Sequence, residues 1–270
     1  MLSHGFFLPR QKQILLNVGE YMNSLILEKV EAGIQTITLN RPDKKNAITL
    51  DMYQSLTQAL KRAKDDDAIK VSVITGAGND FSAGNDLSEF VQLAQTPDKL
   101  NITFDFLNSI STHPKPVIAA VEGMAVGIGV TMLLHCDLVV ASESCKFILP
   151  FAKLGLVPEA ASSYLIPNLV GHQKAFELLV LGEAFDVTLA ENFGLINTAC
   201  DKGEAFELAQ AYARKVSALP SQAVQLSKQL LKQSESDNTQ LALAKESRIF
   251  KERLQSQEAR EAFMAFLSKG

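Results

Sequence analysis

The chain has 270 residues, of which 47% are hydrophobic and 21% are charged, a composition that excludes a disordered or fibrous protein. Its 26 basic and 30 acidic side chains give a net charge of −4, which argues against a general nucleic-acid-binding protein. An anionic ligand would therefore have to be bound by a few local lysines or by backbone N–H groups.

The first two thirds of the chain predict alternating strands and helices. Residues 1–21 show no clear period and are interpreted as an N-terminal extension. Apolar and polar residues then alternate on both sides of Glu31-Ala32-Gly33, which predicts a β-hairpin, and Thr49 is placed to cap a helix that reaches Lys64. The further predicted strands are 71–75, 117–121 and 138–141, and the further predicted helices begin near Leu87 and span 100–111 and 127–134.

The remainder of the chain is predicted to be mostly helical. From Gly171 onward only Leu195–Thr198 resembles a strand. Four amphipathic segments follow, namely Glu204–Leu219, Ser221–Gln233, Thr239–Gln255 and Glu258–Ser268. We therefore expect an α/β core over residues 22–200 and a helical C-terminal region over residues 201–270.

One apolar stretch, Val117–Leu134, could be mistaken for a membrane span. It contains a single charged residue, Glu122, but three glycines interrupt it and no basic flank follows it. It therefore predicts a buried strand, turn and helix. No secretory leader is recognisable, the cysteines lack metal or disulfide spacing, and the chain does not end in Ser-Lys-Leu, so we expect a cytoplasmic protein without membrane contact.

Two predicted strands run into helices through turns of small residues, at 81–87 and at 123–129. The first N–H groups of a helix are unpaired and lie at its positive end, so two such turns could bind one carbonyl oxygen as an oxyanion hole. The glycines could equally serve only for tight turning and close packing. Spacing alone leaves both interpretations open.

The motifs Phe81-Ser82-Ala83-Gly84-Asn85-Asp86-Leu87, Gly127-Ile128-Gly129 and Cys136-Asp137-Leu138 strongly resemble the crotonase (enoyl-CoA hydratase/isomerase) superfamily. The resemblance covers nearly the whole chain. It implies a spiral of ββα units with a C-terminal helical trimerisation region, an acyl-CoA thioester as substrate, and assembly as a homotrimer or hexamer. It also implies that no metal or separate cofactor is needed. Carried over by position, the two oxyanion donors are the backbone N–H groups of Ala83 and Ile128.

The residues at the family's acid–base positions indicate which reaction the chain performs. A hydratase of this family uses two glutamates, and Thr131 and Phe151 stand at their positions. Neither side chain can act as a carboxylate base. Glu159 instead resembles the single catalytic glutamate of peroxisomal-type Δ3,Δ2-enoyl-CoA isomerases. This implies conversion of 3-enoyl-CoA to 2-trans-enoyl-CoA in fatty-acid metabolism.

Other interpretations of these residues remain. Glu159 could be only a carboxylate at a helix N-terminus after Pro158. The protein could also catalyse another crotonase-type reaction on a specialised acyl-CoA, or bind CoA without catalysis.

The resemblance also implies positions for CoA. The loop of Lys44 and Lys45 would lie near its phosphates and pantetheine arm, although it could be only a solvated loop. Asp86 could bind substrate or only cap the following helix. The residues predicted to bind substrate are Lys44, Lys45, Asn46, Ala47, Asn85, Asp86, Leu87, Phe151, Phe266 and Lys269, the last two within reach of a neighbouring subunit's CoA.

Overall fold

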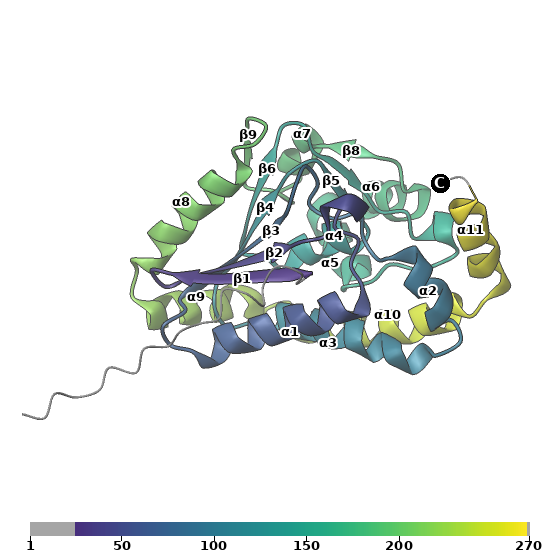
Figure 1. Cartoon of the computed structure of the whole chain (residues 1–270), viewed down its shortest axis with the longest axis horizontal. Helices are drawn as coiled ribbons and strands as arrows, with labels where there is room; N and C mark the ends of the chain where they lie inside the picture. The colour runs from purple at the N-terminus through teal and green to yellow at the C-terminus, as the bar shows by residue number, and fades with distance from the viewer. Residues whose placement is uncertain (1–24, 269–270) are drawn as a thin grey trace, which may run out of the picture.

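The computed structural model describes residues 25–268, and Figure 1 shows how these residues are arranged. The extension predicted over residues 1–21 and the predicted substrate contact at Lys269 lie outside the described residues.

A six-stranded sheet forms the centre of the molecule. Its strands lie in the order β1-β2-β3-β4-β6-β9, and all neighbours are parallel except the hairpin of β1 and β2. The strands are β1 (Ile26–Glu31), β2 (Ile34–Leu39), β3 (Val71–Gly76), β4 (Val117–Val121), β6 (Leu138–Ser142) and β9 (Thr198–Cys200). The predicted hairpin is confirmed, whereas the last strand begins three residues later than the sequence indicates.

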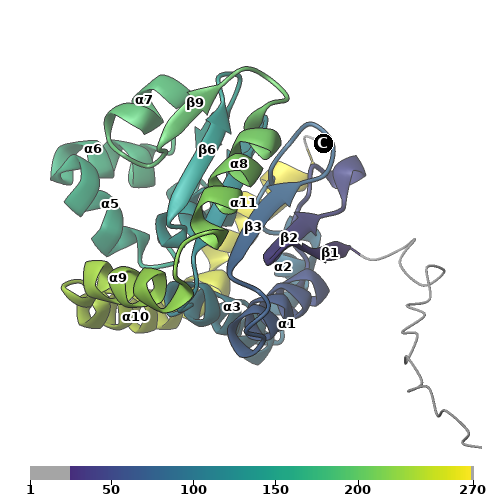
Figure 2. The same ribbon diagram turned by 90° about the vertical axis from the view of Figure 1, so that its left-hand side faces the viewer.

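Helices cover both faces of this sheet because its central strands are apolar on both sides. In β4 every residue is buried, with Val117, Ala119 and Val121 in the main core and Ile118 and Ala120 in a second cluster under α8 (Ala205–Ser217). This continuous apolar pattern is typical of a parallel strand buried on both faces. Figure 2 shows α8 lying across the strands, so this helix forms part of the layered core.

A second, three-stranded sheet was not predicted. It consists of β5 (Met124–Val126), β7 (Lys146–Ile148) and β8 (Phe185–Asp186). Strands of two or three residues are too short to show an alternating pattern, which explains why the sequence did not reveal them.

The predicted helices are present with small shifts at their ends, except that the helix predicted over 127–134 divides into α4 and the helical turn η3. The helices not yet given are α1 (Leu50–Asp65), α2 (Leu87–Leu93), α3 (Asn101–Ser111), α4 (Ile128–Thr131), α5 (Ser162–Val170), α6 (His172–Phe176), α7 (Val187–Asn192), α9 (Ser221–Gln233), α10 (Ser236–Leu254) and α11 (Gln257–Leu267). Short helical turns are η1 (Pro42–Lys44), η2 (Pro97–Leu100), η3 (Met132–His135), η4 (Ala152–Leu154) and η5 (Glu177–Leu181).

The stretch from Val117 to Leu134 forms β4, β5, α4 and part of η3, as the interruption by glycines predicted. Within residues 25–268, no helix combines the length and apolar character needed to cross a membrane.

Candidate active site

A cavity of about 330 Å³ lies where the two glycine-containing turns meet the C-terminal helices. Its wall is mostly apolar. Among the described residues that line it, only Glu159 has an acidic side chain. The lining residues are Ala83, Gly84, Asn85, Leu87, Phe90, Val126, Gly127, Pro150, Phe151, Lys153, Leu154, Leu156, Glu159, Phe250, Ala262, Ala265 and Phe266.

Backbone hydrogen bonds hold the two turns side by side. The N–H of Ser82 donates to the carbonyl of Met124 at 3.0 Å, and the N–H of Val126 donates to the carbonyl of Ser82 at 2.9 Å. A Cβ atom on Gly84 would come within 2.7 Å of the Val126 carbonyl oxygen, and one on Gly129 within 2.8 Å of the Ser82 carbonyl oxygen. Glycine is therefore required at both positions for this close approach.

The hydrogen bonds of the first turn change the predicted oxyanion donor. The N–H of Ala83 donates to the carbonyl of Lys45 at 2.8 Å, so it is already paired. The N–H of Asn85 has no hydrogen-bond partner among residues 25–268. The geometry therefore favours Asn85 over Ala83 as the donor from this turn.

Ile128 is the donor predicted from the second turn, and this role stays a prediction. It is the first residue of α4, where backbone N–H groups have no partner within the helix. Its own side chain is fully buried, and Gly127 immediately before it lines the cavity. The predicted donor of the second turn therefore lies directly after a residue that lines the cavity.

Glu159 is the predicted base, and its side chain faces this apolar wall. Only 2% of the residue is exposed, and its Oε1 atom has no hydrogen-bond partner among the described residues. Burial, with a smaller contribution from the charge of Glu246, raises the pKa of Glu159 to about 8. A carboxyl group with such a pKa can take up and release a proton near neutral pH.

Asn85 connects this carboxylate to a buried tyrosine. The Asn85 side chain partly offsets the increase in the pKa of Glu159. The Tyr53 hydroxyl, from α1, donates a hydrogen bond to Oδ1 of Asn85. The side chain of Asn85 thus contacts Tyr53 and lowers the pKa of Glu159, and the substrate contact predicted for Asn85 stays a prediction.

The positions at which hydratases carry glutamates hold no acid here. Thr131 is completely buried, and its hydroxyl has no partner among the residues that the structure describes. Phe151 is 4% exposed and forms part of the cavity wall, together with Leu154 and Leu156. The cavity therefore contains one carboxylate at the reacting position, where a hydratase would have two.

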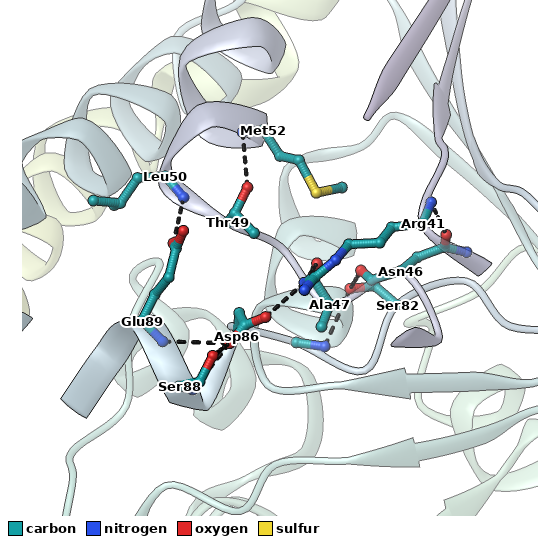
Figure 3. A network of polar contacts seen from close by, with 11 residues as sticks. Arg41, Asn46, Ala47, Thr49, Leu50, Met52, Ser82, Asp86, Ser88 and Glu89 are labelled. Carbon is teal, nitrogen blue, oxygen red and sulfur yellow. Dashed lines mark hydrogen bonds and ion pairs between the residues drawn. The ribbon is translucent and has the colours of Figure 1, made fainter. Parts of the chain in front are cut away.

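The loop predicted to contact CoA lies against the first turn through an ion pair. Figure 3 shows the Arg41 guanidinium pointing at Asp86, with 2.6 Å between Nη1 and Oδ2. Asp86 also caps α2, since its Oδ1 accepts the N–H groups of Ser88 and Glu89. Burial alone would raise the pKa of Asp86, but the hydrogen bonds of Ser88 and Arg41 lower it below the usual value. The capping interpretation of Asp86 is thus confirmed.

The other residues of this loop divide into structural and exposed groups. Asn46 is completely buried, and its amide donates to the carbonyls of Ala77 and Asp80, so its side chain supports the loop. Lys44 and Lys45 are exposed, and the Lys45 ammonium group donates a hydrogen bond to Sδ of Met124 at 3.6 Å. Ala47 is half-buried, and its carbonyl accepts a hydrogen bond from Arg41.

Leu87 and Phe266 both line the cavity. Phe266 comes from α11 of the same chain, so in this structure it contributes to the cavity of its own chain. Its ring is 59% exposed, which leaves it accessible to a ligand at the mouth of the cavity.

Three residues of this site were missed by sequence reasoning: Arg41, Tyr53 and Glu246. Tyr53 and Glu246 lie on the buried faces of α1 and α10, where an apolar side chain is expected. A buried glutamate among apolar helix positions is unusual, and this could have drawn attention to Glu246. Nothing in the sequence indicates the contact of Arg41 with Asp86.

Comparison with known proteins places this site in a family. The enoyl-CoA hydratase/isomerase family matches residues 29–270. Enoyl-CoA delta isomerase 2 of Rattus norvegicus is 37% identical over 253 residues, which cover 90% of this chain and 63% of the rat protein. The 1,2-epoxyphenylacetyl-CoA isomerase of Escherichia coli (strain K12) is 35% identical over 256 residues, which cover 92% of this chain and 97% of that protein.

A solved structure agrees with these relatives. The structure of Pseudomonas aeruginosa OdaA superposes with a TM-score of 0.88 at 41% sequence identity, covering 91% of this chain and 99% of that chain. The chain therefore belongs to the enoyl-CoA hydratase/isomerase family, the crotonase superfamily.

Proposed function

We propose that the protein is a Δ3,Δ2-enoyl-CoA isomerase that converts 3-enoyl-CoA to 2-trans-enoyl-CoA in fatty-acid metabolism. The observation that carries the proposal is the single buried carboxylate of Glu159, which faces an apolar cavity while Thr131 and Phe151 stand at the hydratase acid–base positions. Moving a double bond requires one group that shuttles a proton, whereas hydration also requires a water molecule to be activated.

The proposed mechanism begins with the thioester oxygen at the two backbone donors. The N–H groups of Asn85 and Ile128 would stabilise the negative charge that develops on this oxygen, and one such donor contributes about 3–4 kcal/mol in enzymes where this was measured. Ionised Glu159 removes a proton from C2, which leaves a conjugated dienolate. The same carboxyl group returns the proton to C4, and the double bond then lies between C2 and C3.

The cavity wall supports this chemistry by excluding water. Phe151, Leu154 and Leu156 surround the reacting position with apolar surface. Exclusion of water strengthens the electrostatic interactions with the dienolate and disfavours hydration of the product. No metal or separate cofactor takes part in the proposed steps, in which CoA enters as part of the substrate.

CoA itself is proposed to lie along the exposed loop of Lys44 and Lys45. Two ammonium groups on an otherwise acidic protein suit a ligand with several phosphates. Leu87 and Phe266, at the cavity wall, would contact the pantetheine arm or the adenine. The names of enoyl-CoA delta isomerase 2 and 1,2-epoxyphenylacetyl-CoA isomerase, which both contain a CoA substrate, support this assignment.

We also infer a homotrimer or hexamer, located in the cytoplasm. Leucines on α9 and α10 are strongly exposed in the single chain, including Leu230 at 69%, Leu231 at 81% and Leu241 at 68%. Such a row of exposed apolar side chains favours contact with another protein surface. Further copies of this chain are the proposed partners.

The function is tested by an absorbance assay with 3-enoyl-CoA substrates of several acyl lengths. The wild-type protein is expected to form 2-trans-enoyl-CoA, and Glu159→Gln is expected to lose this activity while still binding CoA. Hydration of 2-trans-enoyl-CoA is measured in parallel. Absence of isomerisation at every length would contradict the proposal, and a different product would indicate another crotonase-type reaction.

A further inference from the structure

The turn that carries Glu159 has an unfavourable backbone conformation. Ala160 and Ala161 follow the glutamate directly, and both have left-handed φ angles, of 59° and 57°. Residues with a Cβ atom rarely adopt this conformation, and two in succession are more unusual still. Such a turn persists only where the surrounding structure holds it.

Glu246 is the main group that holds this turn from outside. It lies on α10, far along the chain, and only 6% of the residue is exposed. Its Oε2 accepts the N–H of Ala161 at 2.6 Å, and its Oε1 accepts the N–H of Ser163 at 2.8 Å. One carboxylate thus pairs with two backbone donors directly after the catalytic glutamate and caps the N-terminus of α5.

Two further hydrogen bonds hold the turn that follows Glu159. Nε2 of His135 lies 2.8 Å from the carbonyl oxygen of Ala160 and donates to it, since a carbonyl can only accept. The hydroxyl of Ser162 donates to the carbonyl of Glu159 at 2.6 Å. His135 belongs to η3, which directly follows α4, so the same short segment supports an oxyanion donor and the catalytic turn.

We propose that Glu246 is a positioning residue for the reaction, which acts through the turn of residues 159–163 to hold the Glu159 carboxylate at the cavity. This inference rests on the proposed function, in which Glu159 is the proton shuttle. It assigns a catalytic consequence to a residue of the C-terminal helical region that does not line the cavity. Small displacements of a reacting group strongly reduce the reaction rate, so a shift of this turn is expected to reduce kcat.

The charge of Glu246 has a second effect at the same site. Burial raises the pKa of Glu246, whereas its hydrogen bonds with Ser163 and Ala161 lower it. The charge of Glu246 adds to burial in raising the pKa of Glu159. The titratable groups that face Glu159 are Tyr53 from α1 and Glu246 from α10, with His135 of η3 behind the turn. Burial keeps His135 neutral and lowers its pKa to about 4, so it does not titrate in the working range.

The test compares Glu246→Gln and Glu246→Asp with the wild type across pH. Glu246→Gln keeps the size but removes the charge and one acceptor. We expect the plateau value of kcat to fall roughly 10- to 100-fold with little change in KM, because the base is displaced. We also expect the midpoint of the pH profile to move to lower pH, because a neighbouring negative charge is gone.

Glu246→Asp separates the two effects. It keeps the charge, but its shorter side chain cannot reach both N–H groups. We expect kcat to fall while the midpoint stays near that of the wild type. Glu252→Gln is the matched control, because Glu252 lies on the same helix, is exposed, and pairs only with Arg248 among the described residues. It should behave as the wild type does.

A purely structural role for Glu246 predicts another result. The variants would then melt at lower temperature, while the folded protein kept the wild-type kcat and midpoint, and this would overturn the proposal. If Glu246→Gln does not fold, Glu246→Asp decides alone, and a wild-type kcat in that variant overturns the proposal.

Failure of the proposed function would be distinguishable from failure of this inference. If the wild type does not isomerise 3-enoyl-CoA, the Glu159 carboxyl is followed by ¹³C NMR titration, with Glu159→Gln identifying its signal. This measurement needs no turnover. A downward shift of the Glu159 midpoint in Glu246→Gln supports the coupling of the two residues, and an unchanged midpoint refutes it.

Discussion

The hydroxyl of Tyr53 donates a hydrogen bond to Oδ1 of Asn85, and Asn85 lines the same cavity as Glu159. The backbone N–H of the same Asn85 has no hydrogen-bond partner among residues 25–268. Asn85 therefore acts on the pKa of Glu159 through its side chain, and its backbone N–H is the proposed donor to the thioester oxygen. This links the position of the base to that of the proposed oxyanion hole.

Tyr53→Phe is expected to loosen this arrangement without changing the cavity wall. The variant removes the hydroxyl that fixes Oδ1 of Asn85, so the amide can rotate away from Glu159. We expect kcat to fall about 10-fold at nearly constant KM, and the free energy of unfolding to fall by about 1 kcal/mol. Tyr164→Phe, which alters a partly exposed tyrosine on α5, is the control and should leave kcat unchanged. A wild-type kcat in Tyr53→Phe would show that the tyrosine does not orient the site.

The rate of the proposed isomerisation is expected to rise with pH. Glu159 must be ionised to remove a proton, and its pKa is raised to about 8 by burial and by Glu246. The value of kcat/KM should therefore increase through pH 7 and level off above about pH 8. A profile measured from pH 6 to 9.5 in a buffer of constant ionic strength checks this. A midpoint near 4.5, or a flat profile, would show that another group is the base.

Glu159→Gln is expected to be more stable than the wild type at high pH. Between pH 4.5 and about 8 the unfolded chain has released the Glu159 proton while the folded protein retains it, so the stability of the wild type falls as pH rises. Glutamine does not titrate and avoids this loss. The difference in Tm should be largest near pH 8 and shrink toward pH 4.5, as followed by calorimetry. Glu252→Gln, at an exposed site, should show no such trend, and the same absence in Glu159→Gln would mean that Glu159 titrates normally.

Leu231→Glu is expected to break the proposed oligomer. Leu231 is 81% exposed in the single chain, and burial of a charge at an apolar interface is strongly unfavourable. Light scattering should give the mass of a trimer or hexamer for the wild type and a smaller mass for the variant. Val30→Glu, which changes an exposed apolar residue on β1, should assemble as the wild type does. A monomeric wild type would refute the assembly outright.

Most of the element boundaries followed from local patterns in the sequence. The cap at Thr49 and the apolar face of α1 were readable because a helix repeats its buried positions every three to four residues. The hairpin of β1 and β2 was predicted because successive side chains of a strand point to opposite faces, so that apolar and polar residues alternate. The second sheet was not predicted, because its strands of two or three residues are too short to show an alternation of apolar and polar residues.

The candidate site was predicted only in part. Glu159 stood out because the two hydratase positions were filled by Thr131 and Phe151. The unpaired N–H of Asn85 was not predicted. Whether the N–H of Ala83 or that of Asn85 is unpaired depends on which of them donates to the carbonyl of Lys45. Such pairing is a property of how two loops pack, and side-chain identity carries no information about it.

The sequence by itself determined most of the strands and helices and the motifs that mark the family, and through that resemblance it indicated Glu159 as the candidate base. Only the tertiary structure decided how that base is held. Tyr53 and Glu246 belong to helices far from Glu159 along the chain, and each is buried on a face that the periodicity assigns to the core. Periodicity shows that a residue is buried but not what it meets there, because its neighbours are set by the packing of whole elements against one another.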